Sequence, residues 1–386
     1  MATASPSFVP VQTRSERPSS TDVADFPAVT GLEFEWKFAP LDRIRHLTEG
    51  PVDGGPVAFQ YSESAGTSVE WIDRSSPLIG RAGAPEDRAS ALAWSSVEKV
   101  LHILVSGEDS AELVVKRDRF DTAPRAAQIV IEAAPNSRGT VILEHSGDAN
   151  LTENVEIVVG DGAQLTVVTV QEWADTAVHL SSHFATIGRD ANLRHVVVSL
   201  GGSVVRVNPS FHLAGTGSST DSLGLYFADA GQYLEQRPYI DHQAANTRSR
   251  VNYKGALQGA KAHTVWVGDV LIGPHADGTD SYEQNRNLVL SDGTRADSIP
   301  NLEIETGNIV GAGHASSTGR FDDEQLFYLQ SRGISEEEAR RLVVRGFLAE
   351  IITQIGSPAL EERLSAAVEA ELVQAEVVRA AAGAHA

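Results

Sequence analysis

The chain has 386 residues, with 52 acidic and 31 basic side chains and a formal net charge of −21. Proteins that bind nucleic acids neutralise phosphates with clustered Lys and Arg, so this balance argues against a nucleic-acid partner. Cysteine is absent, which excludes disulfides, thiol nucleophiles, thiolate zinc sites and metal clusters held by this chain's own thiolates. The sequence has neither an apolar run of about 18 residues nor the apolar block of a secretory signal. We therefore expect a cytoplasmic protein without a membrane partner.

The N-terminal part falls into two segments. Residues 1–30 are rich in Ser, Pro and Thr and lack periodic apolar positions, which predicts a mobile tail. Residues 31–110 combine short aromatic-rich strand patterns with a helical pattern that begins at Ala89. We expect a small mixed cap there.

Residues 111–320 form a long series of short β-branched runs separated by Gly, Asp, Asn and Ser. Turn signals at Gly160–Ala163, Gly188–Ala191 and Gly215–Gly217 lie about 28 residues apart, as expected for stacked coils. A β-sandwich also gives short strands and turn signals. The uninterrupted length of this pattern is large for one sandwich, so we favour a β-solenoid core.

Residues 321–386 change to a helical pattern. Ser335 followed by Glu338 is a capping box, and Gly356 before Pro358 marks the end of one helix and the start of another. Both helices carry an apolar stripe. We expect a separate C-terminal α-helical subdomain whose apolar face is a candidate docking surface.

The common enzyme motifs are absent. The sequence has no P-loop and no G-x-S-x-G elbow, and the Gly-rich segment Gly311–Ser316 lacks the third glycine of a dinucleotide fingerprint. We therefore expect a protein that is not an enzyme. One alternative stays open, a stand-alone β-solenoid enzyme acting on carbohydrate. Its candidate acids are scattered along the chain: Asp277, Asp280, Glu283, Asp292 and Asp297.

The chain has twelve histidines. His179 and His183 lie four residues apart, but the surrounding pattern is strand-like, which would put the two rings about 13 Å apart, too far for one metal ion. We interpret both as polar surface residues. We expect ordinary hydrogen-bonding roles for five others: His145, His195, His212, His263 and His275.

From Asn252 onward the sequence carries QNRNLVLS, PNLEI, GHASSTG and DEQLFYLQSRGI followed by EEAR. Over about 100 residues these motifs closely resemble the SufB/SufD family of iron–sulfur cluster assembly proteins. The resemblance implies a mainly β chain with a right-handed parallel β-helix core, a small N-terminal cap and C-terminal helices. The segments described above give the expected domains: a tail (1–30), a cap (31–110), the core (111–320) and the helical subdomain (321–386).

Two positions, together with the absence of cysteine, resemble the SufD branch of this family more than the SufB branch. Thr294 stands where SufB sequences have a sulfur-accepting cysteine, and a hydroxyl cannot hold a persulfide. The segment Gly313–Ala315 stands where SufB sequences tend to have Glu-His-Glu. At one further position the chain departs from the SufD branch: many SufD sequences have a cysteine where this chain has Ala312, so His314 is left as the one candidate soft-metal ligand here.

The resemblance implies a scaffold subunit that pairs its core with a SufB-like subunit and holds a SufC-like ATPase through its C-terminal helices. It places His314 at the core interface as an iron or nascent-cluster ligand, with no cofactor bound stably by the chain alone. We assign the ATPase-docking role to five residues of the first long helix: Leu342, Val343, Phe347, Leu348 and Ile351.

The remaining motif residues have structural interpretations. We expect Gln284, Asn285 and Arg286 to tie neighbouring coils together, and the run Leu326–Leu329 to lie in a core. A further alternative to the SufB pairing stays open: a homodimer that delivers iron, since the same edge strands could pair with themselves.

Overall fold

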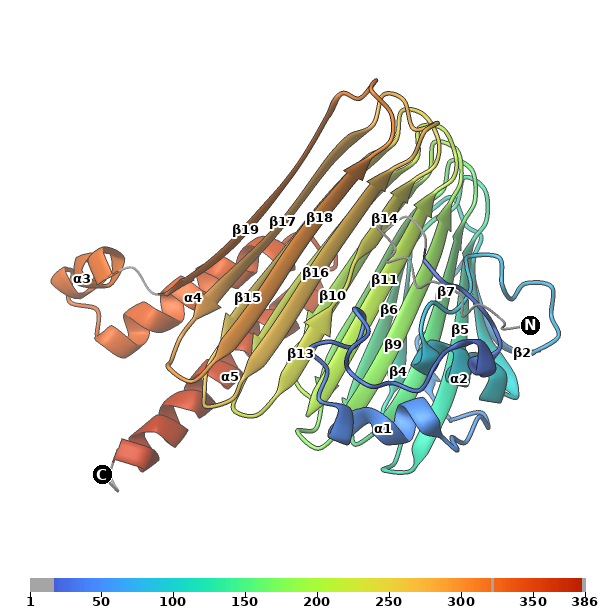
Figure 1. Ribbon diagram of the computed structural model, residues 1–386. Helices are drawn as coiled ribbons and strands as arrows, with labels where there is room; N and C mark the ends of the chain where they lie inside the picture. The colour runs from blue at the N-terminus through green and yellow to red at the C-terminus, as the bar shows by residue number, and fades with distance from the viewer. Residues whose placement is uncertain (1–16, 321–322, 384–386) are drawn as a thin grey trace, which may run out of the picture.

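The computed structural model describes residues 17–320 and 323–383. Its body is a β-solenoid of about 8 turns, in which nearly every coil contributes one strand to each of two sheets (Figure 1). The prediction of a mainly β solenoid is confirmed. Neighbouring strands within a sheet are parallel, apart from β1 on β4 and β2 on β3, so the alternative of an antiparallel sandwich is excluded.

The two sheets take alternate strands of the chain. Sheet B has the order β1 (Gln60–Tyr61), β4 (Ala111–Arg117), β6 (Arg138–Gly147), β8 (Gln164–Trp173), β10 (Asn192–Ser199), β12 (Ser219–Ala228), β15 (Arg248–Leu257), β17 (Asp280–Val289) and β19 (Gly311–Arg320). Sheet A has the order β2 (Thr67–Asp73), β3 (Lys99–Val105), β5 (Pro124–Ala133), β7 (Asn150–Val159), β9 (Val178–Ile187), β11 (Val204–Leu213), the split pair β13 (Tyr233–Gln236) and β14 (Tyr239–His242), β16 (His263–Ile272) and β18 (Arg295–Ile304).

The core lies between the two sheets and is built from side chains in register. One such column runs through sheet A from coil to coil: Ile131, Ile157, Ala185, Phe211 and Ile240. All five side chains are buried. Because successive residues of a strand face opposite sides, every second position of each run enters this core.

The N-terminal cap packs on the outer face of sheet A. It contains η1 (Val23–Asp25), α1 (Leu41–Glu49) and α2 (Arg88–Ser96), and the two α-helices contact β5, β7 and β9. Residues 17–30, which the sequence predicted to be a mobile tail, are part of this cap. Phe26 is buried, and its carbonyl accepts a hydrogen bond from Arg88 Nη1. Residues 1–16 lie outside the described residues.

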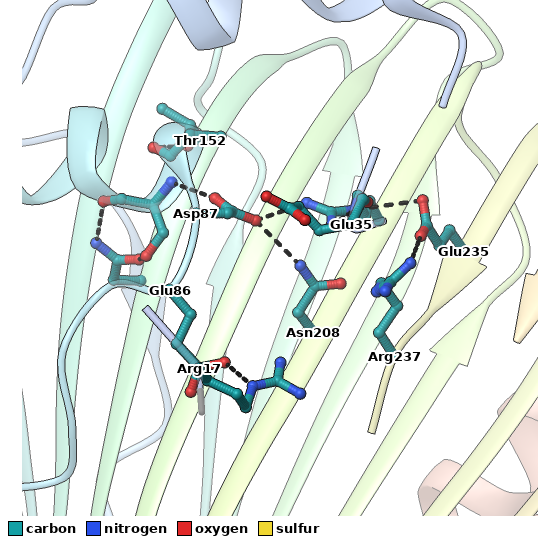
Figure 2. A network of polar contacts seen from close by, with 12 residues as sticks. Arg17, Glu35, Glu86, Asp87, Thr152, Asn208, Glu235 and Arg237 are labelled. Atoms are coloured by element: carbon teal, nitrogen blue, oxygen red, sulfur yellow. Dashed lines mark hydrogen bonds and ion pairs between the residues drawn. The ribbon is translucent and has the colours of Figure 1, made fainter. Parts of the chain in front are cut away.

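A network of charged side chains joins the cap to sheet A (Figure 2). Asp87 Oδ1 accepts from the Ser90 backbone NH and caps α2, while its Oδ2 accepts from Arg206 Nη1 at 2.7 Å. Arg206 Nε also lies 3.2 Å from Glu235 Oε2. All three charged groups are buried, so this ion-pair network fixes the position of the cap on the solenoid.

Three helices follow the solenoid: α3 (Asp323–Ser331), α4 (Glu336–Ile352) and α5 (Pro358–Gly383). As predicted, Ser335 is the N-cap of α4 and accepts from the Glu338 NH. The predicted helices at the C-terminal end are confirmed, and the apolar stripes of α4 and α5 join one buried cluster with the outer face of sheet B. Within the described part of the chain, no helix is long and apolar enough to cross a membrane.

Candidate functional site

The last coil of the solenoid leaves two strand edges unpaired. β19 pairs only with β17 and β18 only with β16, and no further strand of residues 17–320 or 323–383 covers them. Unpaired backbone groups on a parallel edge can pair with another chain. Exposed apolar side chains lie at the same end: Tyr282, Ile304 and Val310. This end of the solenoid is therefore a candidate protein interface.

His314 lies on this unpaired strand. Its side chain is 45% exposed, and it is the register neighbour of Glu283 on β17. The distance from His314 Nδ1 to Glu283 Oε1 is 3.7 Å, which is longer than a hydrogen bond. The imidazole is thus accessible from outside and faces a carboxyl group that comes from the interior.

Glu283 is almost fully buried. Burial and the neighbouring carboxylate of Asp269 raise the pKa of Glu283 to about 8. Without a partner cation this side chain is therefore mainly protonated at neutral pH. A cation held between Glu283 and His314 would favour the carboxylate form, so the pair can supply one nitrogen and one oxygen ligand. In the sequence Glu283 is one of several scattered acids, because the register that brings it to His314 is a property of the folded coils.

The pair does not form a complete metal site. Among the described residues it has no third His, Asp or Glu close enough to make a three-ligand group. Thr294 is also engaged locally, since its hydroxyl donates to the Ser291 carbonyl at 3.2 Å. An ion at His314 would need further ligands from a second chain.

The three motif residues Gln284, Asn285 and Arg286 differ in their surroundings. Asn285 is buried and donates to the Tyr226 hydroxyl at 2.7 Å, two coils away, and to the Tyr253 carbonyl. Gln284 is half-buried, whereas Arg286 is exposed. Inter-coil hydrogen bonds therefore come from Asn285, and the expected coil-tying role does not extend to the exposed Arg286.

The docking residues predicted on α4 are only partly available. Leu348 and Ile351 are fully buried against sheet B, which corrects the prediction that they bind a partner, because binding would require α4 to leave the sheet. Leu342, Val343 and Phe347 are half-buried. The prediction of a core position was also wrong for Phe327 and Tyr328 on α3, which are 72% and 56% exposed.

Four histidines expected in ordinary polar or surface positions face the interior instead: His145, His179, His183 and His195. His179 and His183 lie an even number of residues before the core residues Ala185 and Ile187 on the same strand, so all four side chains face the same side of sheet A. This alternation is visible in the sequence and indicates that both histidines face the core. The other three make surface contacts or are exposed: His212 lies 3.1 Å from Asp241, His263 lies 2.7 Å from Asp297, and His275 is exposed.

A family model described as SUF system FeS cluster assembly, SufBD core domain, matches residues 118–347. Over 366 residues the chain is 49% identical to an iron–sulfur cluster assembly SufBD family protein of Mycobacterium leprae, covering 92% of this chain and 93% of the relative. The chain belongs to the SufBD family. A SufBD family protein of Mycobacterium tuberculosis is equally similar, and one of Staphylococcus saprophyticus is 33% identical over 195 residues, or 50% of this chain and 41% of the relative.

The SufBD match includes the candidate interface at the end of the solenoid. Residues 118–347 contain β17, β18 and β19 with Glu283 and His314, together with α3 and most of α4. The resemblance to the SufB/SufD family inferred from the sequence motifs is thereby confirmed.

Proposed function

We propose that this SufBD chain is a non-catalytic, SufD-like scaffold subunit that assembles iron–sulfur clusters in the cytoplasm together with a SufB-like subunit and a SufC-like ATPase. The observation that carries this proposal is the unpaired end of the solenoid with the accessible His314 beside Glu283. The chain has no cysteine, so thiolate ligands for iron must come from a partner.

The proposed core partner is another SufBD solenoid. The free edges of β18 and β19 offer backbone hydrogen bonds, and Ile304 and Val310 add apolar surface at the same place. An imidazole beside a partner thiolate is a suitable ligand pair for iron. Iron or a nascent cluster is here the cargo of the complex, held at the junction of the two chains.

The proposed ATPase-docking surface is α3 together with the exposed face of α4. Phe327 and Tyr328 are large exposed side chains on a short helix, and such aromatic residues commonly anchor interfaces. The half-buried Leu342 and Val343 extend this surface. Leu348 and Ile351 do not contact the ATPase in this proposal. They hold α4 against sheet B.

The contacts of α4 also suggest how the ATPase would affect the core interface. Lys254 on β15 forms an ion pair with Glu350 and donates to the Phe347 carbonyl at 3.1 Å. A displacement of α4 that follows ATP binding would therefore act directly on β15, two strands before β19 in sheet B. We expect it to loosen the interface at His314.

The test is anaerobic co-expression of the chain with its SufB-like and SufC-like partners. We expect His314→Ala to retain both partners but lose bound iron and sulfide. We expect Phe327→Ser with Tyr328→Ser to lose the ATPase and keep the core partner, and Val310→Asp to do the reverse. A wild-type chain that retains neither partner would overturn the proposal, and a His314→Ala complex with a full cluster would remove the ligand role.

A homodimer is the second candidate, since the same unpaired edges are present in each copy. Size measurement of the isolated chain distinguishes it, because Val310→Asp should then convert a dimer into a monomer.

By contrast, no observation favours a carbohydrate-active enzyme. Asp280 pairs with Arg250, and Asp297 pairs with Arg295 and His263, so these acids serve as ion-pair partners.

A further inference from the structure

Three side chains converge inside the solenoid, far from the unpaired end. His145 on β6, Glu153 on β7 and His179 on β9 are all buried. Glu153 Oε2 lies 3.4 Å from His145 Nε2 and 3.5 Å from His179 Nε2, and the three atoms lie within 4.8 Å of one another. None of these atoms has a hydrogen-bond partner within the described chain, although buried polar atoms normally have one.

The hydrogen bonds around His179 determine which of its nitrogens carries the proton. Trp173 Nε1 can only donate, and it lies 2.7 Å from Gln171 Oε1, so the oxygen of this amide faces the tryptophan. His179 Nδ1 lies 2.8 Å from the same oxygen and 3.2 Å from Trp173 Nε1. Because the oxygen is the nearer atom to both nitrogens and can only accept, His179 Nδ1 donates to it. In a neutral ring, His179 Nε2 then presents a lone pair to Glu153.

His145 is arranged in the same way. Its Nδ1 lies 3.3 Å from the Val170 carbonyl, which can only accept, so Nε2 of a neutral ring again presents a lone pair. With both rings neutral, the two Nε2 lone pairs face Glu153 Oε2, an oxygen of the carboxyl group that pairs with Arg117 through Oε1.

We propose that His145, Glu153 and His179 bind one divalent transition-metal ion, of the Zn²⁺ or Fe²⁺ class, inside the solenoid. Three acceptors at this separation repel unless a cation lies between them. A tetrahedral ion with bonds of about 2.0–2.1 Å holds its ligand atoms about 3.3 Å apart, close to the two observed Nε2–Oε2 distances. Two imidazoles and one carboxylate, without thiolate, are a donor set for zinc or iron.

The surrounding residues form hydrogen bonds and an ion pair with the three proposed ligands, as the residues around the ligands of known metal sites do. Gln171 and the Val170 carbonyl orient the two rings. Arg117 forms an ion pair with Glu153 through Oε1, which leaves Oε2 for the ion. Such contacts fix the tautomer and orientation of metal ligands.

The charge of the group has a further consequence. Glu153 and Arg117 already neutralise each other, so the ion adds two uncompensated positive charges to a buried region. We therefore expect the remaining coordination position to take a small anion such as hydroxide. The ion would join β6, β7 and β9, strands of both sheets, and so stabilise the folded coils.

This site is separate from His314, since β8, β10, β12, β15 and β17 lie between β6 and β19 in sheet B. It also differs from the expectation, drawn from the sequence, that the chain alone holds no metal. The proposal does not depend on the proposed function, because metal content can be measured on the chain without its partners.

The test supplies the ion during folding, because the site is buried. The full chain is expressed in minimal medium with Co²⁺, and in parallel with Zn²⁺ or Fe²⁺, and metal content and the visible spectrum are measured after purification. We expect about one ion per chain and cobalt d–d bands of a four- or five-coordinate site. His179→Gln and Glu153→Gln should each lower metal content about tenfold or more, whereas His314→Ala and His212→Gln should retain it.

A second measurement covers variants that fail to fold. Wild type is unfolded in guanidinium with a chelator and refolded with or without Co²⁺. A cobalt-dependent rise in Tm together with bound cobalt supports the site. Folded wild-type chain that holds none of the three metals after either procedure overturns it, as does a folded His179→Gln variant with full metal content.

Discussion

His314 Nδ1 lies 3.7 Å from Glu283 Oε1, across the last two strands of sheet B. The imidazole is on the unpaired edge strand and half-exposed, whereas the carboxyl group is buried one strand further in. An exposed imidazole is thus backed by a buried carboxyl group, and a cation bound at His314 would change the charge of that group. The arrangement suits an ion that is bound transiently between two chains.

This relationship predicts the effect of Glu283→Gln in the complex with partners. The amide keeps the volume of the side chain but cannot become an anion, so we expect complex formation to persist and bound iron to fall about tenfold. Iron and sulfide analysis of the purified complex measures this. Asp292→Asn, at an exposed position, is the control and should bind iron like wild type. Wild-type iron content in Glu283→Gln would contradict the prediction.

The packing of two tyrosines against two glycines predicts a large steric effect. Gly224 is the register neighbour of Tyr253, and Gly255 is that of Tyr226. A Cβ on Gly224 would lie 2.0 Å from Tyr253 Cδ1, and the tyrosine is fully buried. We expect Gly224→Ala to destabilise the chain by about 1–3 kcal/mol or more, measured by urea unfolding.

Gly319→Ala is the matched control for Gly224→Ala, because a Cβ at Gly319 meets nothing within 4 Å. The double variant Gly224→Ala with Tyr253→Val removes the ring that the new methyl group would meet. Its stability should not fall below that of Tyr253→Val alone by more than a few tenths of a kcal/mol. Equal stability of Gly224→Ala and wild type would show that the tyrosine can shift.

The sequence was sufficient to predict the solenoid because its evidence is local and repeated. Strand patterns of period two and turns such as Gly160–Ala163 recur in each coil, and the Ser335 cap is a feature of a few neighbouring residues. The motif around His314 also lies within one segment. Features of this kind can be recognised in the sequence because the residues that form them are close together in the chain.

Contacts between distant residues could not be predicted in the same way. Glu283 meets His314, and His145 meets Glu153 and His179, only through the register of the coils. The apolar stripe of α4 was correctly recognised, but a stripe does not say whether it faces a partner or the chain's own sheet B. Phe327 and Tyr328 are adjacent on a helix and therefore face different directions, which was a missed indication of exposure.

The ion pairs of Arg206 predict that the cap depends on one buried guanidinium. Arg206→Met leaves Asp87 buried without its cation and Glu235 with Arg237 alone, and removing one partner of a buried pair costs about 3–5 kcal/mol. We expect lower stability and faster hydrogen exchange in α2, measured by mass spectrometry. Arg45→Met is the control, since Arg45 is exposed and its pair with Glu49 is 3.9 Å long. Unchanged exchange in α2 would show that apolar contacts alone hold the cap.

Glu371 on α5 predicts a pH dependence of stability. Burial, followed by the charges of Asp229, Asp175 and Glu172, raises the pKa of Glu371 to about 7 from 4.5. A raised carboxyl pKa means that the folded chain binds more protons than the unfolded chain between these two values, so stability is full below about pH 4.5 and falls as pH rises through about 7.

The corresponding variant is Glu371→Gln, which removes the ionisable group and keeps the size of the side chain. We expect wild type to lose about 1–3 kcal/mol between pH 5 and pH 8 through this group, allowing for its partial exposure, and Glu371→Gln to lose correspondingly less. Urea unfolding at intervals of pH measures both curves. Glu362→Gln, at an exposed position on the same helix, should run parallel to wild type. If the Glu371→Gln curve is also parallel to wild type, the carboxylate of Glu371 is solvated in the folded chain and α5 is less tightly seated on sheet B than its contacts indicate.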